Sequence, residues 1–202
     1  MRLTESGIER MAADRLHADR PHLSGEQLAK FCPLCGAPLA DRLIEEEQQV
    51  RKVCSGCGFI FYLNPKVVAG AVPRQGRDGR IWLLRRNISP GMGLWTFPGG
   101  YVDLGESVPD AAVRETFEET RLQVRIDGIL NVYSYAHVGI VLVVYRATVT
   151  GGEAAPTPES QEARLFRLDE IPWGELAFTS TRDAMRDYVE HERKEPGSGH
   201  DK

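Results

Sequence analysis

Three glutamates, Glu115, Glu118 and Glu119, lie three and four residues apart in the chain. If this stretch is a helix, their side chains share one face. Like charges at this spacing repel, and each pair costs an exposed helix a few tenths of a kcal/mol. A divalent cation that prefers oxygen ligands removes the conflict, and Mg²⁺ and Mn²⁺ are the natural candidates. The alternative is a solvated acidic face, which three glutamates alone would favour.

The residues around the glutamates predict how they are positioned. Ser107 to Asp110 has the pattern of a helix N-cap, with Pro109 in the first turn, where its missing N–H does no harm. We expect the helix to run to about Thr120. Just upstream, residues 95–102 read as a strand that a sharp loop at residues 98–100, Pro-Gly-Gly, interrupts.

Apolar runs elsewhere predict an α/β domain over residues 64–190. Strands are expected at residues 66–72, 80–85, 124–135, 138–150 and 164–168, with the first two joined as a hairpin. A closing helix is expected over residues 179–191. Residues 1–30 are polar and read as an N-terminal extension that is either helical in short stretches, at residues 5–17 and 25–30, or partly disordered. Residues 191–202 read as a disordered tail.

All four cysteines fall into two C-x-x-C pairs separated by eighteen residues: Cys32, Cys35, Cys54 and Cys57. This spacing lies in the range of a four-cysteine zinc site, and we assign residues 31–63 to a zinc ribbon. A glycine after each pair, Gly36 and Gly58, allows the turn to close. Four thiolates leave Zn²⁺ no open position, so the site is predicted to be structural. The alternative is a redox pair or two unrelated thiol pairs.

Composition narrows the class of protein. The 202 residues are 42% apolar and carry a net charge of −4, as in an ordinary soluble globular protein. The first twenty residues are charged throughout, and no apolar run approaches the roughly 20 residues that span a bilayer, so we expect a cytoplasmic protein. Acidic residues balance the few basic ones in the ribbon, which argues against a nucleic-acid surface there.

The glutamates belong to a longer pattern. Gly100, Glu106 and residues 114–119, Arg-Glu-Thr-Phe-Glu-Glu, resemble the Nudix box, in which every charged position is filled here. Two positions depart from it. Thr116 stands where an aliphatic residue is usual, and Arg121 replaces the glycine that closes the helix, a left-handed position that costs a non-glycine residue about 1 kcal/mol.

The resemblance implies a fold and a set of roles. The fold is α/β (α+β), a sandwich with a mixed sheet between helices over about residues 66–188, preceded by the small zinc ribbon. The three box glutamates and the carbonyl of Gly99 would hold the Mg²⁺ or Mn²⁺ ions. Glu106 and Arg114 would pair to brace the loop against the helix. Relatives often recruit a further glutamate as metal ligand or base, and Glu159, with Glu162 second, fits that placement unless both are loop charges.

The family hydrolyses nucleoside diphosphates linked to another group, and its members are often dimers, so the resemblance implies a homodimer. A ribbon followed by residues 59–66, Phe-Ile-Phe-Tyr-Leu-Asn-Pro-Lys, and then the box resembles the NADH-pyrophosphatase-like branch. The SQPWPFPxS tract that marks NADH specificity is absent. Residues 132–134, 170–173 and 177–178 are similar to ribbon-bearing FAD and ADP-ribose pyrophosphatases of plants.

We therefore expect a small-molecule ADP conjugate of the ADP-ribose, FAD or NADH class, split into two monophosphates. Arg85 is the candidate phosphate contact. The candidates for stacking on the base, each of which has a place in the core as its alternative, are Trp95, Phe97, Tyr133 and Phe178. Two other functions stay open: a non-catalytic ligand sensor, which the intact glutamates disfavour, and processing of NAD-capped RNA ends, which the ribbon's charge disfavours.

Overall fold

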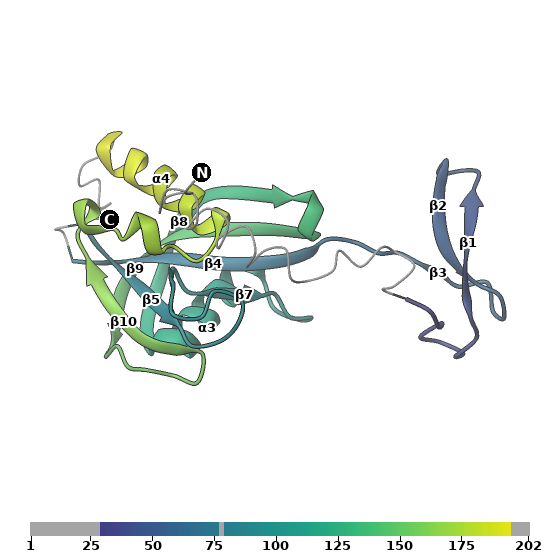
Figure 1. Ribbon diagram of the computed structural model, residues 1–202, viewed down its shortest axis with the longest axis horizontal. Coiled ribbons are helices and arrows are strands. Elements are labelled where there is room, and N and C mark those ends of the chain that lie inside the picture. The colour runs from purple at the N-terminus through teal and green to yellow at the C-terminus, as the bar shows by residue number, and fades with distance from the viewer. Residues whose placement is uncertain (1–28, 77–78, 195–202) are drawn as a thin grey trace, which may run out of the picture.

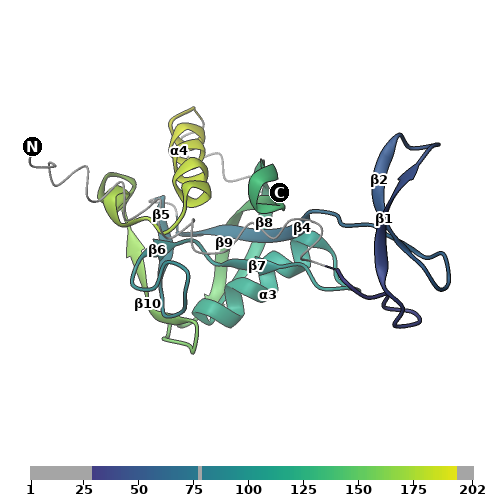
Figure 2. The ribbon, with the colours of Figure 1, turned by 45° about the vertical axis from the view of Figure 1, so that its right-hand side comes forward.

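The computed structural model describes residues 29–76 and 79–194, which form a small sheet and a large one (Figure 1). The helices expected within residues 5–17 and most of the N-terminal extension lie outside the described residues. Both views show the small sheet at the end of the molecule away from β10 (Figures 1 and 2).

The small sheet is an antiparallel unit with strand order β1-β2-β3. Its strands are β1 (Leu39–Ile44), β2 (Gln49–Cys54) and β3 (Ile60–Phe61). A compact core of Cys32, Leu39 and Cys54, with Phe59 and Phe61 packed against it, holds the cysteine turns beside these strands. Residues 62–65 then lead directly into the large sheet.

The large sheet is mixed, as the resemblance implied. Its main strands run in the order β10-β5-β4-β9-β8, and β4 and β9 are parallel while their neighbours pair antiparallel. These strands are β4 (Lys66–Gln75), β5 (Arg80–Arg86), β8 (Leu122–Tyr135), β9 (Ile140–Gly152) and β10 (Ser160–Phe166). Two short strands complete it: β6 (Trp95–Thr96) pairs with β5, and β7 (Gly99–Tyr101) pairs with β4.

Several strand boundaries differ from the expected ones: β4 continues to Gln75 rather than residue 72, and β8 begins at Leu122 rather than residue 124. The 3-10 turn η1 (Ala136–Val138) connects β8 to β9, so β9 begins at Ile140 rather than at residue 138. Strand β10 begins at Ser160, four residues earlier than expected, because it pairs with β5 from Arg86 onward. Because β10 begins earlier, Glu159 directly precedes a strand of the large sheet.

Helices α3 (Val108–Thr120) and α4 (Thr179–Lys194) cover opposite faces of the large sheet (Figure 1). Successive residues of a strand point to opposite faces. In β4, Ala69 and Ala71 therefore pack in the cluster that holds Ala111 and Ala112 of α3. Val72 packs in the other cluster, with α4 residues such as Met185. The alanine side chains of β4 and α3 let the helix lie close to the sheet. This short separation determines how close the α3 glutamates come to the strands.

Both ends of α3 follow the expectation from sequence. Ser107 is the N-cap, and its Oγ accepts a hydrogen bond from the Asp110 amide at 3.3 Å. Arg121 adopts the left-handed conformation at φ 65°, and its amide donates to the Phe117 carbonyl at 2.8 Å. The helix thus ends as it would with glycine, despite a backbone cost of about 1 kcal/mol.

Helix α4 corrects one boundary. It continues to Lys194, so residues 191–194, expected at the start of a disordered tail, are helical. Lys194 Nζ lies 2.7 Å from Glu190 Oε1 one turn earlier, which supports this last turn. Residues 195–202 lie outside the described part of the chain. Within the described ranges, no helix has the length and apolar character needed to cross a membrane.

Candidate functional site

The glycine strand β7 lies so close to β4 and α3 that side chains do not fit there. Gly99 and Gly100 pair with Gly70 and Ala69 of β4. A Cβ on Gly99 would lie 2.7 Å from the Ala69 carbonyl oxygen, and a Cβ on Gly100 would overlap the Glu115 carboxylate. Glycine is required at position 99, where backbone atoms are the obstacle, whereas at position 100 the Glu115 side chain would have to move. The close approach places the β7 backbone directly beside the acidic helix.

Glu119 is the buried member of the glutamate set. Its side chain is 5% exposed, and its Oε2 accepts a hydrogen bond from the Gly99 amide at 2.8 Å. Burial raises the pKa of Glu119 to about 8, an effect to which the charges of Glu115 and Glu159 add. Burial also raises the pKa of Glu115, against the influence of Arg114. The site therefore concentrates carboxylates where ionisation is costly.

Arg114 braces the loop that precedes α3. Its Nε and Nη2 donate to the two carboxylate oxygens of Glu106 at 3.0 and 2.7 Å, and Nη2 also donates to the Tyr101 carbonyl at 3.1 Å. This two-point pairing lowers the pKa of Glu106 to about 2. The geometry is the pairing that the resemblance implied, and it ties residues 101–106 to the helix.

The remaining Arg114 nitrogen, Nη1, lies between two of the box glutamates. It donates to Glu115 Oε1 at 2.8 Å and to Glu118 Oε2 at 3.0 Å. Arg114 Nη1 thus bridges the two carboxylates. Of the residues described, only the four cysteines form a group of three or more acidic, His or Cys ligands whose ligand atoms lie within 4.8 Å of one another. Glu118 is exposed, and Arg114 is its ion-pair partner.

The segment before β10 is tied to the end of α3. The buried Ser160 donates its hydroxyl to the Glu119 carbonyl at 2.6 Å, and the Glu159 carbonyl accepts from the Asn87 amide at 2.8 Å. These bonds hold Glu159 where its charge acts on Glu115 and Glu119. Glu162, the second candidate from the sequence, instead lies 3.7 Å from Arg85 on the neighbouring strand β5.

Arg86 is a site residue that the sequence analysis did not name. Burial lowers the pKa of its guanidinium, while the charges of Glu119 and Glu159 oppose that shift. Its Nε donates to the Pro90 carbonyl at 2.8 Å, and its guanidinium lies 5.1 Å from the centre of the Phe178 ring. The adjacent Arg85, which we had named, donates to the Gly93 carbonyl. Neighbouring strand residues point to opposite faces, so one of the two arginines faces the carboxylates.

The aromatic candidates divide into two groups. Trp95 and Phe97 are 3% and 5% exposed within the core, and Trp95 packs edge-on against Phe166 at 5.0 Å. Burial leaves neither ring an open face for a base. The two residues are therefore part of the core and not the substrate contacts that we expected. Tyr133 donates its hydroxyl to Asp187 at 2.6 Å, which ties β8 to α4. Phe178 is half-buried and lies beside Arg86.

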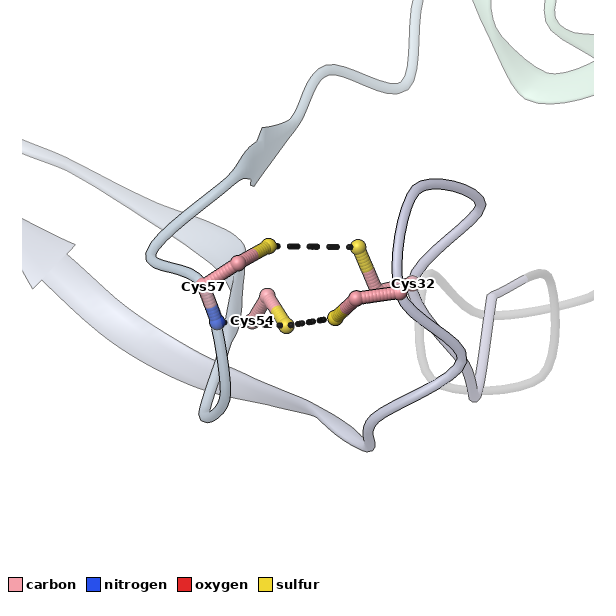
Figure 3. Close-up of side chains that lie close together, drawn as sticks. Cys32, Cys54 and Cys57 are labelled. Atoms are coloured by element: carbon pink, nitrogen blue, oxygen red, sulfur yellow. Dashed lines mark hydrogen bonds between the residues drawn. The ribbon is translucent and has the colours of Figure 1, made fainter.

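The cysteines form a four-sulfur cluster with the dimensions of a zinc site. Cys32 and Cys57 Sγ are 3.7 Å apart, Cys35 and Cys54 Sγ are 3.4 Å apart, and all four lie within 4.8 Å of one another. A tetrahedron with Zn–S bonds of about 2.3 Å has edges of about 3.8 Å. Figure 3 shows Cys32 facing Cys54 and Cys57 from the opposite turn.

The cysteine turns favour metal binding. The amides of Cys57 and Gly56 donate to Cys54 Sγ, and these bonds lower the pKa of Cys54 to about 6, toward the thiolate that binds metal. Gly36 and Gly58 have φ values of 74° and 75°, as expected for the residues that close the two turns. The described cysteines form no disulfide. The cluster therefore fits a closed structural zinc site.

We predict that the purified protein carries one Zn²⁺ per chain and that Cys54→Ser loses it, because three thiolates and a hydroxyl bind Zn²⁺ far more weakly than four thiolates. Metal content by mass spectrometry and thermal unfolding with and without a chelator measure this. Ser55→Ala, which alters the exposed neighbour, is the control and should keep its zinc. A zinc-free wild-type protein with unchanged thermal stability would contradict the assignment.

The raised pKa of Glu119 predicts how stability depends on pH in buffer without added divalent cations. The unfolded chain ionises Glu119 near pH 4.5, while the folded chain keeps its proton until about pH 8. The contribution of protonated Glu119 to the free energy of unfolding is therefore fully present below pH 4.5, and it is lost as the pH rises to about 8. Denaturant unfolding across this range should show a decline that Glu119→Gln flattens and the exposed Glu118→Gln does not. Equal slopes in all three proteins would contradict the assignment.

Comparison with known proteins places this geometry in a family. The model of the NUDIX domain matches residues 64–189, well over half of the chain, and the model of the Nudix N-terminal zinc ribbon matches residues 30–63. The crystal structure of a NUDIX hydrolase from Nitrosomonas europaea is similar, with a TM-score of 0.78 and 35% identity, covering 85% of this chain and 97% of that one.

Two curated relatives carry more specific names. An ADP-ribose pyrophosphatase from Methanocaldococcus jannaschii is 34% identical over 137 residues, which cover 65% of this chain and 77% of that protein. The NAD-capped RNA hydrolase NudC from Edwardsiella ictaluri is 29% identical over 164 residues, which cover 81% of this chain but 61% of that relative. With its box carboxylates, braced arginine and cysteine cluster, the chain belongs to the Nudix hydrolase family and carries that family's N-terminal zinc ribbon.

Proposed function

We propose that this enzyme hydrolyses the diphosphate of an ADP conjugate to two monophosphates, with Mg²⁺ or Mn²⁺ held by Glu115, Glu118 and Glu119. The observation that carries the proposal is the carboxylate of Glu119. This carboxylate is almost fully buried and accepts a hydrogen bond from the Gly99 amide, and the charges of Glu115 and Glu159 help to raise its pKa. Such an arrangement is unfavourable unless protons or cations balance the charge.

The residues present fit a hard divalent cation. The ligands offered are carboxylate oxygens, joined in our proposal by the Gly99 carbonyl, and Mg²⁺ and Mn²⁺ prefer such oxygens. A cation there supplies Lewis-acid stabilisation of the charge that develops on the diphosphate. Glu106 binds two of the Arg114 nitrogens, Nε and Nη2. This pairing would therefore remain if Glu115 and Glu118 left Arg114 Nη1 to bind a cation.

Two residues outside the box complete the proposed machinery. We assign Glu159 as a further metal ligand or as the base that takes the proton of the attacking water, because its backbone is held between Asn87 and the end of α3 while its side chain is exposed. We assign Arg86 as a cation that faces the diphosphate, because the Glu119 and Glu159 charges act on it. Phe178, beside Arg86, and Tyr133, whose hydroxyl bonds to Asp187, are the aromatic side chains proposed to contact the base.

The ADP-conjugate class is supported by the name of the archaeal relative, an ADP-ribose pyrophosphatase, and by similarity to the ribbon-bearing group noted in the sequence. NAD-capped RNA is the second candidate, which the names of several relatives favour. The ribbon speaks against it: Arg51 and Lys52 are paired with Glu47 and Asp41, so its surface offers few unpaired cations to RNA there. The homodimer and the cytoplasmic location stay predictions.

We predict that the full chain, with Mg²⁺ or Mn²⁺, converts at least one of ADP-ribose, FAD and NADH to two monophosphates, identified by chromatography. NAD-capped RNA, diadenosine polyphosphates and binding without turnover are the competing outcomes. Preferred turnover of capped RNA would replace the substrate class. Binding of ADP-ribose with no turnover of any substrate would establish the ligand-sensor alternative.

We predict that Glu118→Gln and Glu119→Gln each lower kcat at least about a hundredfold, because each removes a proposed metal ligand. Glu159→Gln should also lower kcat, whereas Glu162→Gln, whose native partner is Arg85, should not. The two glutamates are matched in chemistry, with Glu159 directly before β10 and Glu162 within it. Wild-type kcat in both Glu118→Gln and Glu119→Gln would remove the metal assignment.

A further inference from the structure

An open hollow of about 430 Å³ lies where the 3-10 turn η3 (Trp173–Glu175) meets the first turns of α4. It is lined by Trp173, Gly174, Arg182 and Arg186, which we call the Trp173 hollow. Its volume is comparable to that of small-molecule sites, about 300–1,000 Å³, but it is a shallow depression that leaves a bound ligand largely exposed to solvent. None of these residues belongs to the site proposed above for metal and diphosphate.

The charge of the Trp173 hollow is suited to a phosphate. Two of its four lining residues are arginines and none is a carboxylate. Guanidinium groups bind phosphate oxygens through paired hydrogen bonds. Arg182 is already positioned, because its Nη2 donates to the Trp173 carbonyl at 3.3 Å. One guanidinium is therefore held at the wall of the hollow before any ligand arrives.

The second arginine has one acidic neighbour on its own helix. Arg186 Nη1 lies 3.9 Å from Asp183 Oδ1, beyond hydrogen-bond distance, and the side chain of Arg186 is 67% exposed. The other Asp183 oxygen, Oδ2, accepts the hydroxyl of Tyr135 at 3.0 Å. A long, exposed ion pair of this kind is weak, so Arg186 can turn to an incoming phosphate at little cost.

The aromatic wall supplies the other half of a nucleotide site. Trp173 is 37% exposed, whereas Trp95 is 3% exposed in the core. An exposed indole beside arginines is the combination on which bases stack with little regard to their sequence. Gly174 adds no side chain that would cover the ring.

The Trp173 hollow lies on the connection that also carries Phe178. The Arg182 amide donates to the Phe178 carbonyl at 3.1 Å, and the Phe178 ring lies 5.1 Å from the guanidinium of Arg86. One helical turn thus separates the hollow from the residue that borders the carboxylate site. A ligand in the hollow would use none of the glutamates proposed to hold the metal.

We propose that the Trp173 hollow binds a nucleotide, with the base stacked on Trp173 and the phosphate on Arg182 and Arg186. The same chemistry is offered by a free mononucleotide and by a nucleotide near the 5′ end of an RNA. Binding at the hollow needs no turnover, so it is tested independently of the proposed hydrolysis.

The test is equilibrium binding to the full chain without added divalent cations, using AMP, ribose 5-phosphate and a short 5′-phosphorylated RNA as probes. Arg182→Gln/Arg186→Gln should weaken binding of AMP or of the RNA at least about tenfold, because charge-assisted hydrogen bonds to phosphate are lost. Arg193→Gln, an exposed arginine in the last turn of α4, is the matched control and should bind as wild type. Thermal unfolding checks that each variant is folded.

Trp173 separates base stacking from phosphate binding. Trp173→Leu should weaken AMP binding toward that of ribose 5-phosphate and leave ribose 5-phosphate unchanged, while Trp173→Phe should restore most of the loss. Binding of AMP identifies a free nucleotide as the ligand, and binding of the RNA alone identifies an RNA end. Wild-type affinity for both probes in Arg182→Gln/Arg186→Gln, or no binding by the wild-type protein, would overturn the proposal.

Discussion

The hydrogen bond from the Gly99 amide to the buried Glu119 carboxylate is the contact on which the site depends. At 2.8 Å it fixes the distance between strand β7 and helix α3. The backbone of β4 leaves no room for a Cβ at Gly99, and the Glu115 carboxylate of α3 occupies the place that a Cβ at Gly100 would take. The hydrogen bond from Gly99 to Glu119 also requires α3 to lie close to the sheet, which the alanines at their contact allow. Backbone packing and carboxylate burial are thus one constraint.

Charge balance is the second consequence of that burial. Carboxylates gathered at the inner end of α3 repel one another, and two arginines offset part of this repulsion. Arg114 bonds to Glu106, Glu115 and Glu118 from within the helix, while Arg86 approaches from β5. Burial nevertheless raises the pKa of Glu119, and the charge of Arg86 only partly opposes that shift. A divalent cation is the remaining partner that the chemistry of this cluster favours.

The sequence predicted the features that depend on local spacing. Each of these features involves residues only a few positions apart: helix α3, its Ser107 cap, the left-handed Arg121 and the cysteine turns. The mixed sheet followed from the resemblance to the family, and the shared helix face of the glutamates followed from their spacing. These features were accessible because helix periodicity and turn chemistry are read directly from neighbouring residues.

Features that depend on strand register were not accessible. Whether Arg85 or Arg86 faces the carboxylates depends on which face of β5 each occupies, and a shift of one residue exchanges them. The register of β10 against β5 places Glu162 opposite Arg85, with which it forms an ion pair, and leaves Glu159 near the end of α3. Trp95 and Phe97 are aromatic residues beside the glycine loop, and only the packing against Phe166 and α4 shows that they belong to the core.

We propose that the box carboxylates hold a divalent cation. Mn²⁺ binding followed by electron paramagnetic resonance is the sharpest test of this proposal, since Mn²⁺ reports on its own ligands and the zinc cluster of cysteines does not compete for an oxygen-loving ion. We expect a Mn²⁺ site in the wild-type protein whose affinity falls at least about tenfold in Glu119→Gln, because a buried ligand is lost. Equal Mn²⁺ affinity in the two proteins would contradict it.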